Sequence, residues 1–296
     1  MPSFSFAPLA DRSLIRVSGD EAHHFLQNLV TADVEDIDKS GAGSAALLTP
    51  QGKILFDFLI YKQSDAYILD SPAQAAADLL KRLTFYRLRS KVDLELMPDD
   101  VGVVALWNGT ADVDNAIVAV TDPRLPALGQ RFVGPISALL TELGVSAADL
   151  ADYDQHRIEL GVPEGLKDYD YSDIFPHDAV LDQLGGVSFS KGCYVGQEVV
   201  SRVHHRGTAR KRFVKVESSG QLPPKGTTVT ADGKSVGILG SSTLVNGKAF
   251  GLALLRLDKV RQAKDNGIPL QCGDAELQAT LPDWVEFTWP EPNTAD

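Results

Sequence analysis

Short apolar stretches bounded by polar and turn-forming residues recur along the chain, which is a pattern of β-strands. In the first two thirds of the sequence, strands are predicted at residues 14–17, 54–61, 67–69, 91–97, 101–107, 116–120 and 130–133. Apolar residues at helical spacing separate them at residues 25–30, 72–86 and 146–160. This order is less regular than a βαβ series, so we expect mixed sheets with helices on one face.

The pattern changes after residue 207, where short strands follow one another without helices of comparable length. Asp232-Gly233 and Asn246-Gly247 stand between apolar strand segments, which is a strong signal for two-residue β-hairpins. A run of short strands joined by tight turns predicts a small all-β domain, here a barrel. The expected domains are residues 1–98, residues 99–206 and the barrel at residues 207–289.

The charge balance of the chain indicates which classes of binding partner to expect. The 296 residues carry 40 acidic and 28 basic side chains, for a formal net charge of −12. This balance disfavours binding to nucleic acid or to an anionic membrane, so we expect neither as a partner. An acidic protein that binds an anionic ligand should gather its few cations in one place.

Cys193 and Cys272 fit no metal-ligand spacing, and four thiolates usually hold an iron–sulfur cluster. We therefore predict no metal site on this chain alone. Residues 1–11 resemble neither a secretory signal nor an Arg-rich transit peptide. No apolar run reaches the ~18–20 residues of a membrane helix. These features predict a cytoplasmic protein with reduced thiols.

Candidate chemistry is concentrated in residues 185–207. Lys191 lies two positions before Cys193, and Arg202 follows soon after, so this is a local gathering of cations. Nearby cations favour thiolate over thiol, which predicts a reactive Cys193. Gln197 and Glu198 add an amide and a carboxylate that can orient a ligand. Two alternative interpretations are open: Cys193 is a small buried apolar residue, or the glycine-rich stretch with its cations is a solvated loop.

Residues 191–198, Lys-Gly-Cys-Tyr-Val-Gly-Gln-Glu, resemble the signature K-G-C-[YF]-x-G-Q-E of the YgfZ family. That family includes mitochondrial factors that help to mature four-iron clusters, and it is related to the T-protein, the aminomethyltransferase of glycine cleavage. Residues 51–53, 88–92 and 157–163 also resemble family patterns, so the likeness covers nearly the whole chain.

The resemblance implies an α+β fold with two mixed, ferredoxin-like T-protein domains and a C-terminal β-barrel around a central cavity that binds tetrahydrofolate or a related reduced folate. Arg157-Ile158-Glu159 is similar to the T-protein segment whose Glu holds the pterin. A carboxylate can accept two hydrogen bonds from an aminopyrimidine edge, so Glu159 has the required chemistry. The alternative for Glu159 is a solvated helix position.

Asp57 interrupts the apolar strand at residues 54–61, where strand alternation can simply point it outward. By resemblance, it falls where the T-protein has the segment D-D-L-I with its catalytic Asp. Here the second Asp of that segment is Phe58, and Asp70 stands where the T-protein has an Asn. Both departures weigh against aminomethyl transfer.

We therefore expect a folate-binding protein that assists iron–sulfur cluster assembly or repair through Cys193, with assembly or client proteins as partners. Lys191 and Arg202 would keep the thiol ionised or hold the glutamate tail of the folate. The alternative is a tetrahydrofolate-dependent aminomethyltransferase or demethylase, in which Asp57 assists proton transfer. A third interpretation is a folate-binding module without chemistry.

Overall fold

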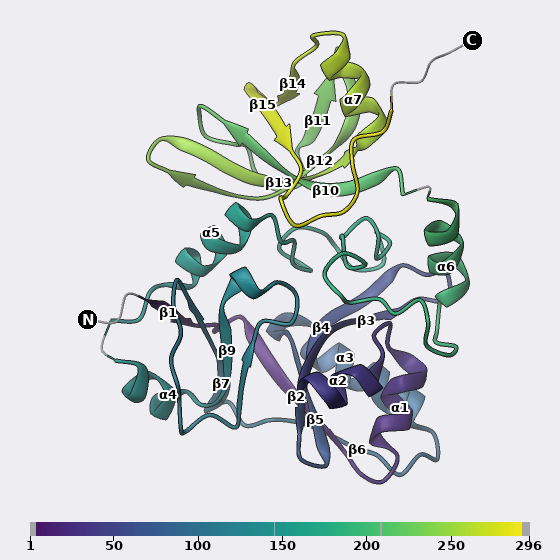
Figure 1. Ribbon diagram of the computed structural model, residues 1–296, viewed down its shortest axis with the longest axis vertical. Coiled ribbons are helices and arrows are strands. Elements are labelled where there is room, and N and C mark those ends of the chain that lie inside the picture. Colours follow the sequence, from purple (N-terminus) through teal and green to yellow (C-terminus); the bar gives the residue numbers. More distant parts are fainter. Residues whose placement is uncertain (1–3, 145, 208, 292–296) are drawn as a thin grey trace. The chain divides into compact units, whose positions relative to one another are not determined.

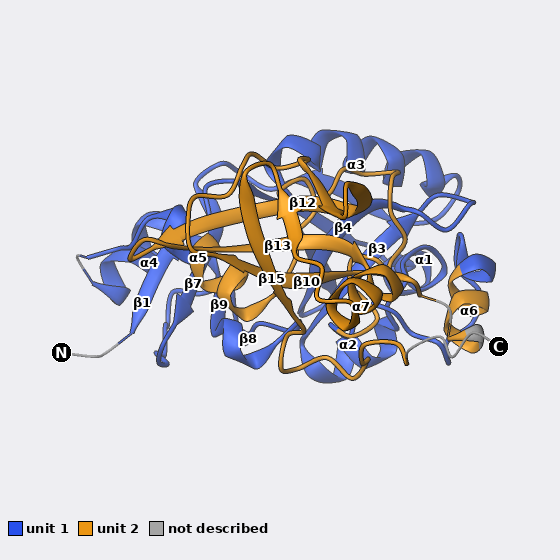
Figure 2. Cartoon of the chain, turned by 90° about the horizontal axis from the view of Figure 1, so that it is seen from above, with its two compact units in different colours: residues 1–153, 184–199 blue, residues 154–183, 200–296 orange. Residues whose placement is uncertain are grey.

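The computed structural model describes residues 4–144, 146–207 and 209–291. The chain forms two compact units (Figure 2). Unit 1 consists of residues 1–153 and 184–199, and unit 2 consists of residues 154–183 and 200–296. The segment at residues 184–199, which contains the cysteine signature, therefore belongs to the same unit as the first half of the chain.

Unit 1 contains two antiparallel sheets (Figure 1). The first has the order β3-β4-β5-β2-β6 and consists of β2 (Arg12–Ser18), β3 (Ala42–Leu48), β4 (Ile54–Gln63), β5 (Ala66–Pro72) and β6 (Asp93–Leu96). The second has the order β1-β7-β9-β8 and consists of β1 (Ser5–Pro8), β7 (Val101–Trp107), β8 (Val118–Thr121) and β9 (Gln130–Pro135). The helical elements of this unit are α1 (Ala22–Leu29), α2 (Val34–Ser40), α3 (Ala73–Arg87), η1 (Pro126–Leu128) and α4 (Ile136–Leu143).

Strand alternation determines how these elements form layers. In β7, Val103 and Ala105 share a core with residues of β2, β4 and β5, so the two sheets pack face to face. Val104 and Leu106 point the other way and pack with Leu139 of α4. On the outer side of the first sheet, α3 packs against β2, β5 and β6. The predicted combination of strands with helices on one face is confirmed, and both sheets are antiparallel. Strand β1 joins the second sheet, and the division at residue 98 stays a prediction.

Unit 2 is dominated by a closed barrel with the strand order β10-β13-β12-β11-β14-β15. Its elements are β10 (Lys211–Ser218), β11 (Thr228–Ala231), β12 (Lys234–Val245), β13 (Lys248–Arg256), α7 (Leu257–Asp265), β14 (Leu270–Cys272) and β15 (Ala275–Thr280). Both predicted hairpins are present, with φ values of 50° at Asp232 and at Asn246 and of 70° and 80° at the glycines that follow. Positive φ at both central positions is what a type I′ turn requires. The predicted barrel is confirmed.

Two further helices cross from one unit into the other. They are α5 (Leu150–Leu160) and α6 (Gln197–Arg206). The first was predicted from residue 146 and begins four residues later, while its predicted stop at Gly161 is confirmed by a φ of 84°. The second was not predicted.

A buried ion network joins the two sheets of unit 1. Asp70 of β5 accepts hydrogen bonds from the Arg131 guanidinium of β9 at 2.8 Å and from the Tyr61 hydroxyl at 2.8 Å. Arg131 also pairs with Asp122 at 2.7 Å. Burial alone would raise the pKa of Asp122, but the ion pairs with Arg124 and Arg131 hold that pKa well below its usual range. Each charge is therefore compensated inside the core.

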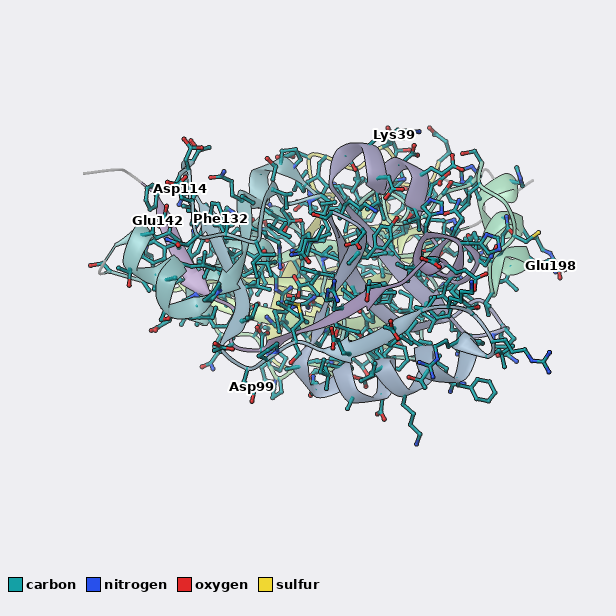
Figure 3. The ribbon with its side chains drawn as sticks, turned by 90° about the horizontal axis from the view of Figure 1, so that it is seen from below. Lys39, Asp99, Asp114, Phe132, Glu142 and Glu198 are labelled. Atoms are coloured by element: carbon teal, nitrogen blue, oxygen red, sulfur yellow. The ribbon has the colours of Figure 1, made fainter. Side chains whose placement is uncertain are left out.

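Replacing Asp70 with Ala would leave the buried Arg131 guanidinium without one of its two carboxylate partners. We expect Asp70→Ala to lower the free energy of unfolding by about 3–5 kcal/mol, measured by urea denaturation. The exposed Asp99 (Figure 3) provides the matched control, and Asp99→Ala should change stability by about 0.5 kcal/mol or less. Equal effects of the two substitutions would contradict a stabilising role for the network.

Candidate functional site

Lys191 fastens the beginning of the cysteine segment to unit 1. Its ammonium donates hydrogen bonds to the carbonyl oxygens of Val30 at 2.9 Å and Ala32 at 2.6 Å. The residue is only 8% exposed. Burial lowers the pKa of Lys191 to about 8, and the nearby Asp33 carboxylate opposes this shift. The side chain on which sequence reasoning relied as a free cation thus serves as a buried anchor.

Thr31, between those two carbonyl groups, connects the same segment to the first sheet. Its hydroxyl donates to the Gly186 carbonyl at 2.6 Å and accepts from the Ala46 amide at 2.8 Å. Its own carbonyl accepts from the Ser188 amide at 2.8 Å. Thr31 is fully buried, and sequence reasoning missed it. The available signal was a single hydroxyl residue between the apolar residues Val30 and Ala32.

The other end of the segment is anchored by Tyr194 and Gly196. Tyr194 is 7% exposed, and burial raises the pKa of its phenol to about 12. Gly196 has a φ of 81°, and a Cβ atom added there would lie 2.5 Å from the carbonyl oxygen of Thr49. Only glycine meets both conditions. This explains physically why the signature carries a glycine at this position.

Cys193 is exposed between these two anchors, whereas Cys272 is buried in the barrel. The structure therefore excludes the interpretation of Cys193 as a small buried apolar residue. Burial raises the pKa of the Cys272 thiol, which keeps that thiol protonated and inert. Of the two thiols, only that of Cys193 is presented to solvent, and it lies in irregular backbone between the buried residues Lys191 and Tyr194.

Gln197 and Glu198 begin α6 rather than lying in a loop. The Gln197 side chain accepts a hydrogen bond from the Tyr194 amide at 3.4 Å, and the Gln197 amide donates to the Tyr194 carbonyl at 3.3 Å. Glu198 is exposed on the outer surface of the first helical turn (Figure 3), where the helix dipole favours a carboxylate. Arg202 is exposed further along the same helix, in the part that belongs to unit 2.

Asp57 lies in β4, in register with Ala46 of β3. Ala46 is the residue whose amide and carbonyl both bond to Thr31. The structure thus places Asp57 one strand away from the attachment point of the cysteine segment. It is half-buried, as expected for a polar position that alternates with the buried Phe56 and Phe58.

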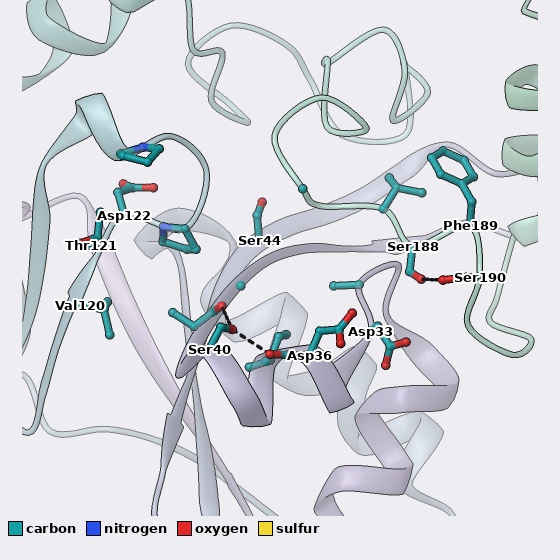
Figure 4. A pocket seen from close by; sticks show the side chains of 18 of the residues that line it. Asp33, Asp36, Ser40, Ser44, Val120, Thr121, Asp122, Ser188, Phe189 and Ser190 are labelled. Atoms are coloured by element: carbon teal, nitrogen blue, oxygen red, sulfur yellow. Dashed lines mark hydrogen bonds between the residues drawn. The ribbon is translucent and has the colours of Figure 1, made fainter. Parts of the chain in front are cut away.

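A cavity of about 1000 Å³ lies within unit 1 (Figure 4). It is bounded by the region of α2, by β8 and by residues 185–190, which lead to Lys191. Carboxylates of Asp33, Asp36 and Asp122 line it, and no lysine or arginine in the described part of the chain does so. Neither Cys193 nor Asp57 belongs to this lining. The cavity therefore lacks the cations that the glutamate tail of a folate would require.

Arg157 and Glu159 lie on α5 in unit 2. The Arg157 guanidinium is fully buried and bonds to Asp168 at 2.7 Å, to Asp154 at 2.7 Å and to Ser241 of the barrel at 3.0 Å. Burial alone would lower its pKa, but the neighbouring carboxylates raise it. Arg157 is thus engaged in holding α5 against the barrel, while Glu159 is half-buried and accepts one hydrogen bond, from Gln155 at 3.1 Å.

Two kinds of feature, a metal-binding cluster and a membrane-spanning helix, are absent from the described residues. Within residues 4–144, 146–207 and 209–291, no three His, Cys, Asp or Glu side chains are grouped so as to hold a metal ion. In the same ranges, no helix has both the length and the apolar character of a membrane span.

The low pKa of Lys191 gives the anchor a pH dependence. An unfolded lysine has a pKa of about 10.4, so between pH 8 and this value the folded protein binds fewer protons than the unfolded chain. The contribution of Lys191 to the free energy of unfolding is complete above the pKa of lysine in the unfolded chain. It is lost as pH falls through the folded-state pKa of about 8. We expect the difference in unfolding free energy between the native protein and Lys191→Met to rise from pH 8 to pH 10 in urea titrations. A difference that stays constant would show that this amine is not buried.

Comparison with known proteins gives three similarities. The model of the CAF17 C-terminal β-barrel domain matches residues 210–287. The iron–sulfur cluster assembly factor IBA57 of Homo sapiens, a mitochondrial protein, is 32% identical over 95% of this chain and 84% of its own length. The corresponding protein of Mycosarcoma maydis is 29% identical over 97% of this chain and 85% of its own length.

Among solved structures, the glycine cleavage aminomethyltransferase T of Bartonella henselae superimposes with a TM-score of 0.74. The match covers 97% of this chain and 88% of that protein at 17% identity, and it confirms the predicted T-protein fold.

The expectation of a cytoplasmic protein is wrong by this comparison, because the human, mouse and Mycosarcoma maydis relatives are mitochondrial by name. That expectation rested on residues 1–11, of which residues 1–3 lie outside the described part of the chain. A compartment is set by addresses that receptors read, not by the chemistry of the folded domain. The resemblance to the signature, by contrast, is confirmed over nearly the full length, and the chain belongs to the family of the IBA57 iron–sulfur cluster assembly factors, the YgfZ family.

Proposed function

We propose that this protein assists the assembly or repair of iron–sulfur clusters and that Cys193 is its reactive thiol. The observation that carries the proposal is the exposure of Cys193 between two buried anchors, Lys191 and Tyr194. A thiol that serves only packing would be buried. The names of the relatives support the same role.

The presence of a single exposed thiol limits the ways in which this protein could bind an iron–sulfur cluster. An iron–sulfur cluster is usually held by four thiolates, and this chain has two cysteines, of which Cys272 is buried. We propose that Cys193 acts as a transient ligand or exchanging thiol for a cluster that other proteins also hold. The cluster is then a substrate that passes between proteins, and the partners are assembly factors or client enzymes.

We propose tetrahydrofolate or a related reduced folate as the small-molecule ligand, a carrier of one-carbon units when bound. Glu159 supports this, because its carboxylate accepts one hydrogen bond from Gln155 and retains acceptor capacity for an aminopyrimidine edge. Arg157 would act indirectly, by holding α5 in place through its ion pairs. Arg202 on α6 is the exposed cation that we propose for the glutamate tail of the folate.

Gln197 and Glu198 have supporting roles in this proposal. The Gln197 side chain holds the Tyr194 amide and so fixes the turn that carries Cys193. Glu198 places a carboxylate beside the same turn. Asp57 is a proposed proton-transfer group only for a folate-dependent transferase. That function is not favoured, because Phe58 replaces an acidic residue of the T-protein pattern, and Asp70, at the position of its Asn, is fully buried in an ion network.

Removal of the exposed thiol tests the assembly role. In cells that lack the native protein, we expect Cys193→Ala to restore less than about a tenth of four-iron enzyme activity, because a missing ligand blocks cluster transfer. Cys272→Ala removes the buried thiol and provides the control, which should restore activity in proportion to the soluble protein produced. Full restoration by Cys193→Ala would refute the proposed role of this thiol.

Folate binding is tested separately on purified protein. Loss of a charged hydrogen-bonding group costs roughly 1.5–3 kcal/mol, so Glu159→Ala should weaken tetrahydrofolate binding by roughly 10- to 150-fold in fluorescence titrations. Gln155→Ala leaves the carboxylate in place and should change the affinity by no more than about threefold. Unchanged affinity in Glu159→Ala would place the pterin elsewhere.

A further inference from the structure

The end of α3 and the loop after it form a concentration of positive charge that the site does not use. Residues 81–91 contain five lysine and arginine side chains and no acidic residue, in a chain whose formal net charge is −12. Lys81, Arg82, Arg89 and Lys91 are exposed. Charge of one sign gathered in this way attracts a partner of the opposite sign and accelerates its association.

Two large apolar side chains lie within this charged stretch. Leu88 is 86% exposed and Phe85 is 69% exposed, which makes them the most exposed large apolar residues in the described part of the chain. Phe85 packs edge-to-face on Tyr86, with ring centroids 5.8 Å apart. The buried side of α3 consists of other residues, including Leu79 and Leu83, so exposure of Phe85 is not needed for folding. Aromatic and arginine side chains together are typical of interface centres.

The backbone holds Leu88 in a strained and fixed position. Its φ is 47°, in the left-handed region that a leucine rarely adopts. The loop is fastened on both sides of residue 90, because the Ser90 amide donates to the Arg87 carbonyl at 2.8 Å and the Lys91 amide donates to the Glu21 carboxylate at 2.6 Å. Strain of this kind persists where the surrounding structure imposes it, often at ligand-contacting sites. A loop whose backbone is held in this way also loses less conformational entropy on binding.

A shallow groove of about 510 Å³ accompanies these side chains. Arg87, Leu88, Arg89 and Lys91 line it together with Gly19, Ser90 and Val92, and Asp20 and Asp93 also contribute. We propose that the 85–91 surface, defined as Phe85, Arg87, Leu88, Arg89 and Lys91, docks an acidic segment of a partner protein. In that segment an apolar side chain would contact Leu88, and neighbouring carboxylates would pair with the arginines.

Other occupants match this surface less well. An anionic membrane would meet a protein whose formal net charge of −12 repels it beyond the patch. Nucleic acid would meet the same repulsion, and its binding depends mainly on the number of phosphates that cations neutralise. An acidic peptide needs only the patch itself, since both of its recognition elements, the apolar contact and the ion pairs, lie within residues 85–91.

The test uses the full chain and a fluorescein-labelled peptide in which Leu and Phe residues alternate with Asp and Glu. Fluorescence polarisation should show saturable binding that weakens as salt concentration rises. Leu88→Asp combined with Arg89→Glu should weaken it roughly tenfold or more. Leu244→Asp combined with Lys264→Glu makes the same change in charge at exposed positions of β12 and α7 and should leave peptide binding unchanged.

A second variant separates docking from folding. Leu88 has φ 47° and ψ −105°, a conformation that glycine adopts without the steric penalty of a Cβ atom, so Leu88→Gly should retain about the native melting temperature while still weakening peptide binding. Equal binding by all variants, or no saturable binding at physiological salt, would overturn the proposal. It would equally be overturned if the Leu88 variants lost binding to anionic phospholipid vesicles, or lost self-association in sedimentation, while peptide binding stayed unchanged.

Discussion

The position of the exposed thiol of Cys193 depends on one buried ammonium group, that of Lys191, and on the two carbonyl oxygens that accept its hydrogen bonds. A buried charge without hydrogen-bond partners is costly, so Lys191 can enter the interior only where acceptors are already in place. The carbonyl groups of Val30 and Ala32 lie just beyond the C-terminal end of α1, where the helix dipole favours a cation. Cys193, two residues later, is thereby confined to the turn that emerges from this attachment. Thr31 reinforces it by linking residues 186 and 188 to β3.

The acceptors are in place because the first sheet is rigid. Its inner face packs against the second sheet through alternating apolar residues, and the ion network of Asp70, Arg131 and Asp122 crosses between the two. The backbone of Ala46 in β3 forms hydrogen bonds with Thr31. The turn at Gly52 lies against Gly196. The chemistry of the thiol is therefore supported by residues that are distant from it in the sequence.

Local patterns in the sequence predicted those parts of the fold that local physics determines. The apolar run at residues 101–107 indicated β7, and Asn246-Gly247 identified a hairpin turn. The helix α6 was missed because Gly196 precedes it instead of a capping hydroxyl or carboxylate, and because β-branched valines dominate its apolar positions. Arg131 and Asp70 are 61 positions apart, so nothing in the local pattern paired them. Lys191 was correctly singled out, but its direction into the protein depends on carbonyl groups that only the folded chain brings near.

The central claim is that Cys193 is exposed to solvent while Lys191 and Tyr194, on either side of it, are buried. Alkylation of the native protein with iodoacetamide, followed by mass spectrometry of both cysteines over time, tests it most directly. Cys193 should be modified at a rate close to that in the denatured chain, and Cys272 should remain unmodified until the protein unfolds. Protection of Cys193 to the same degree as Cys272 would contradict the account.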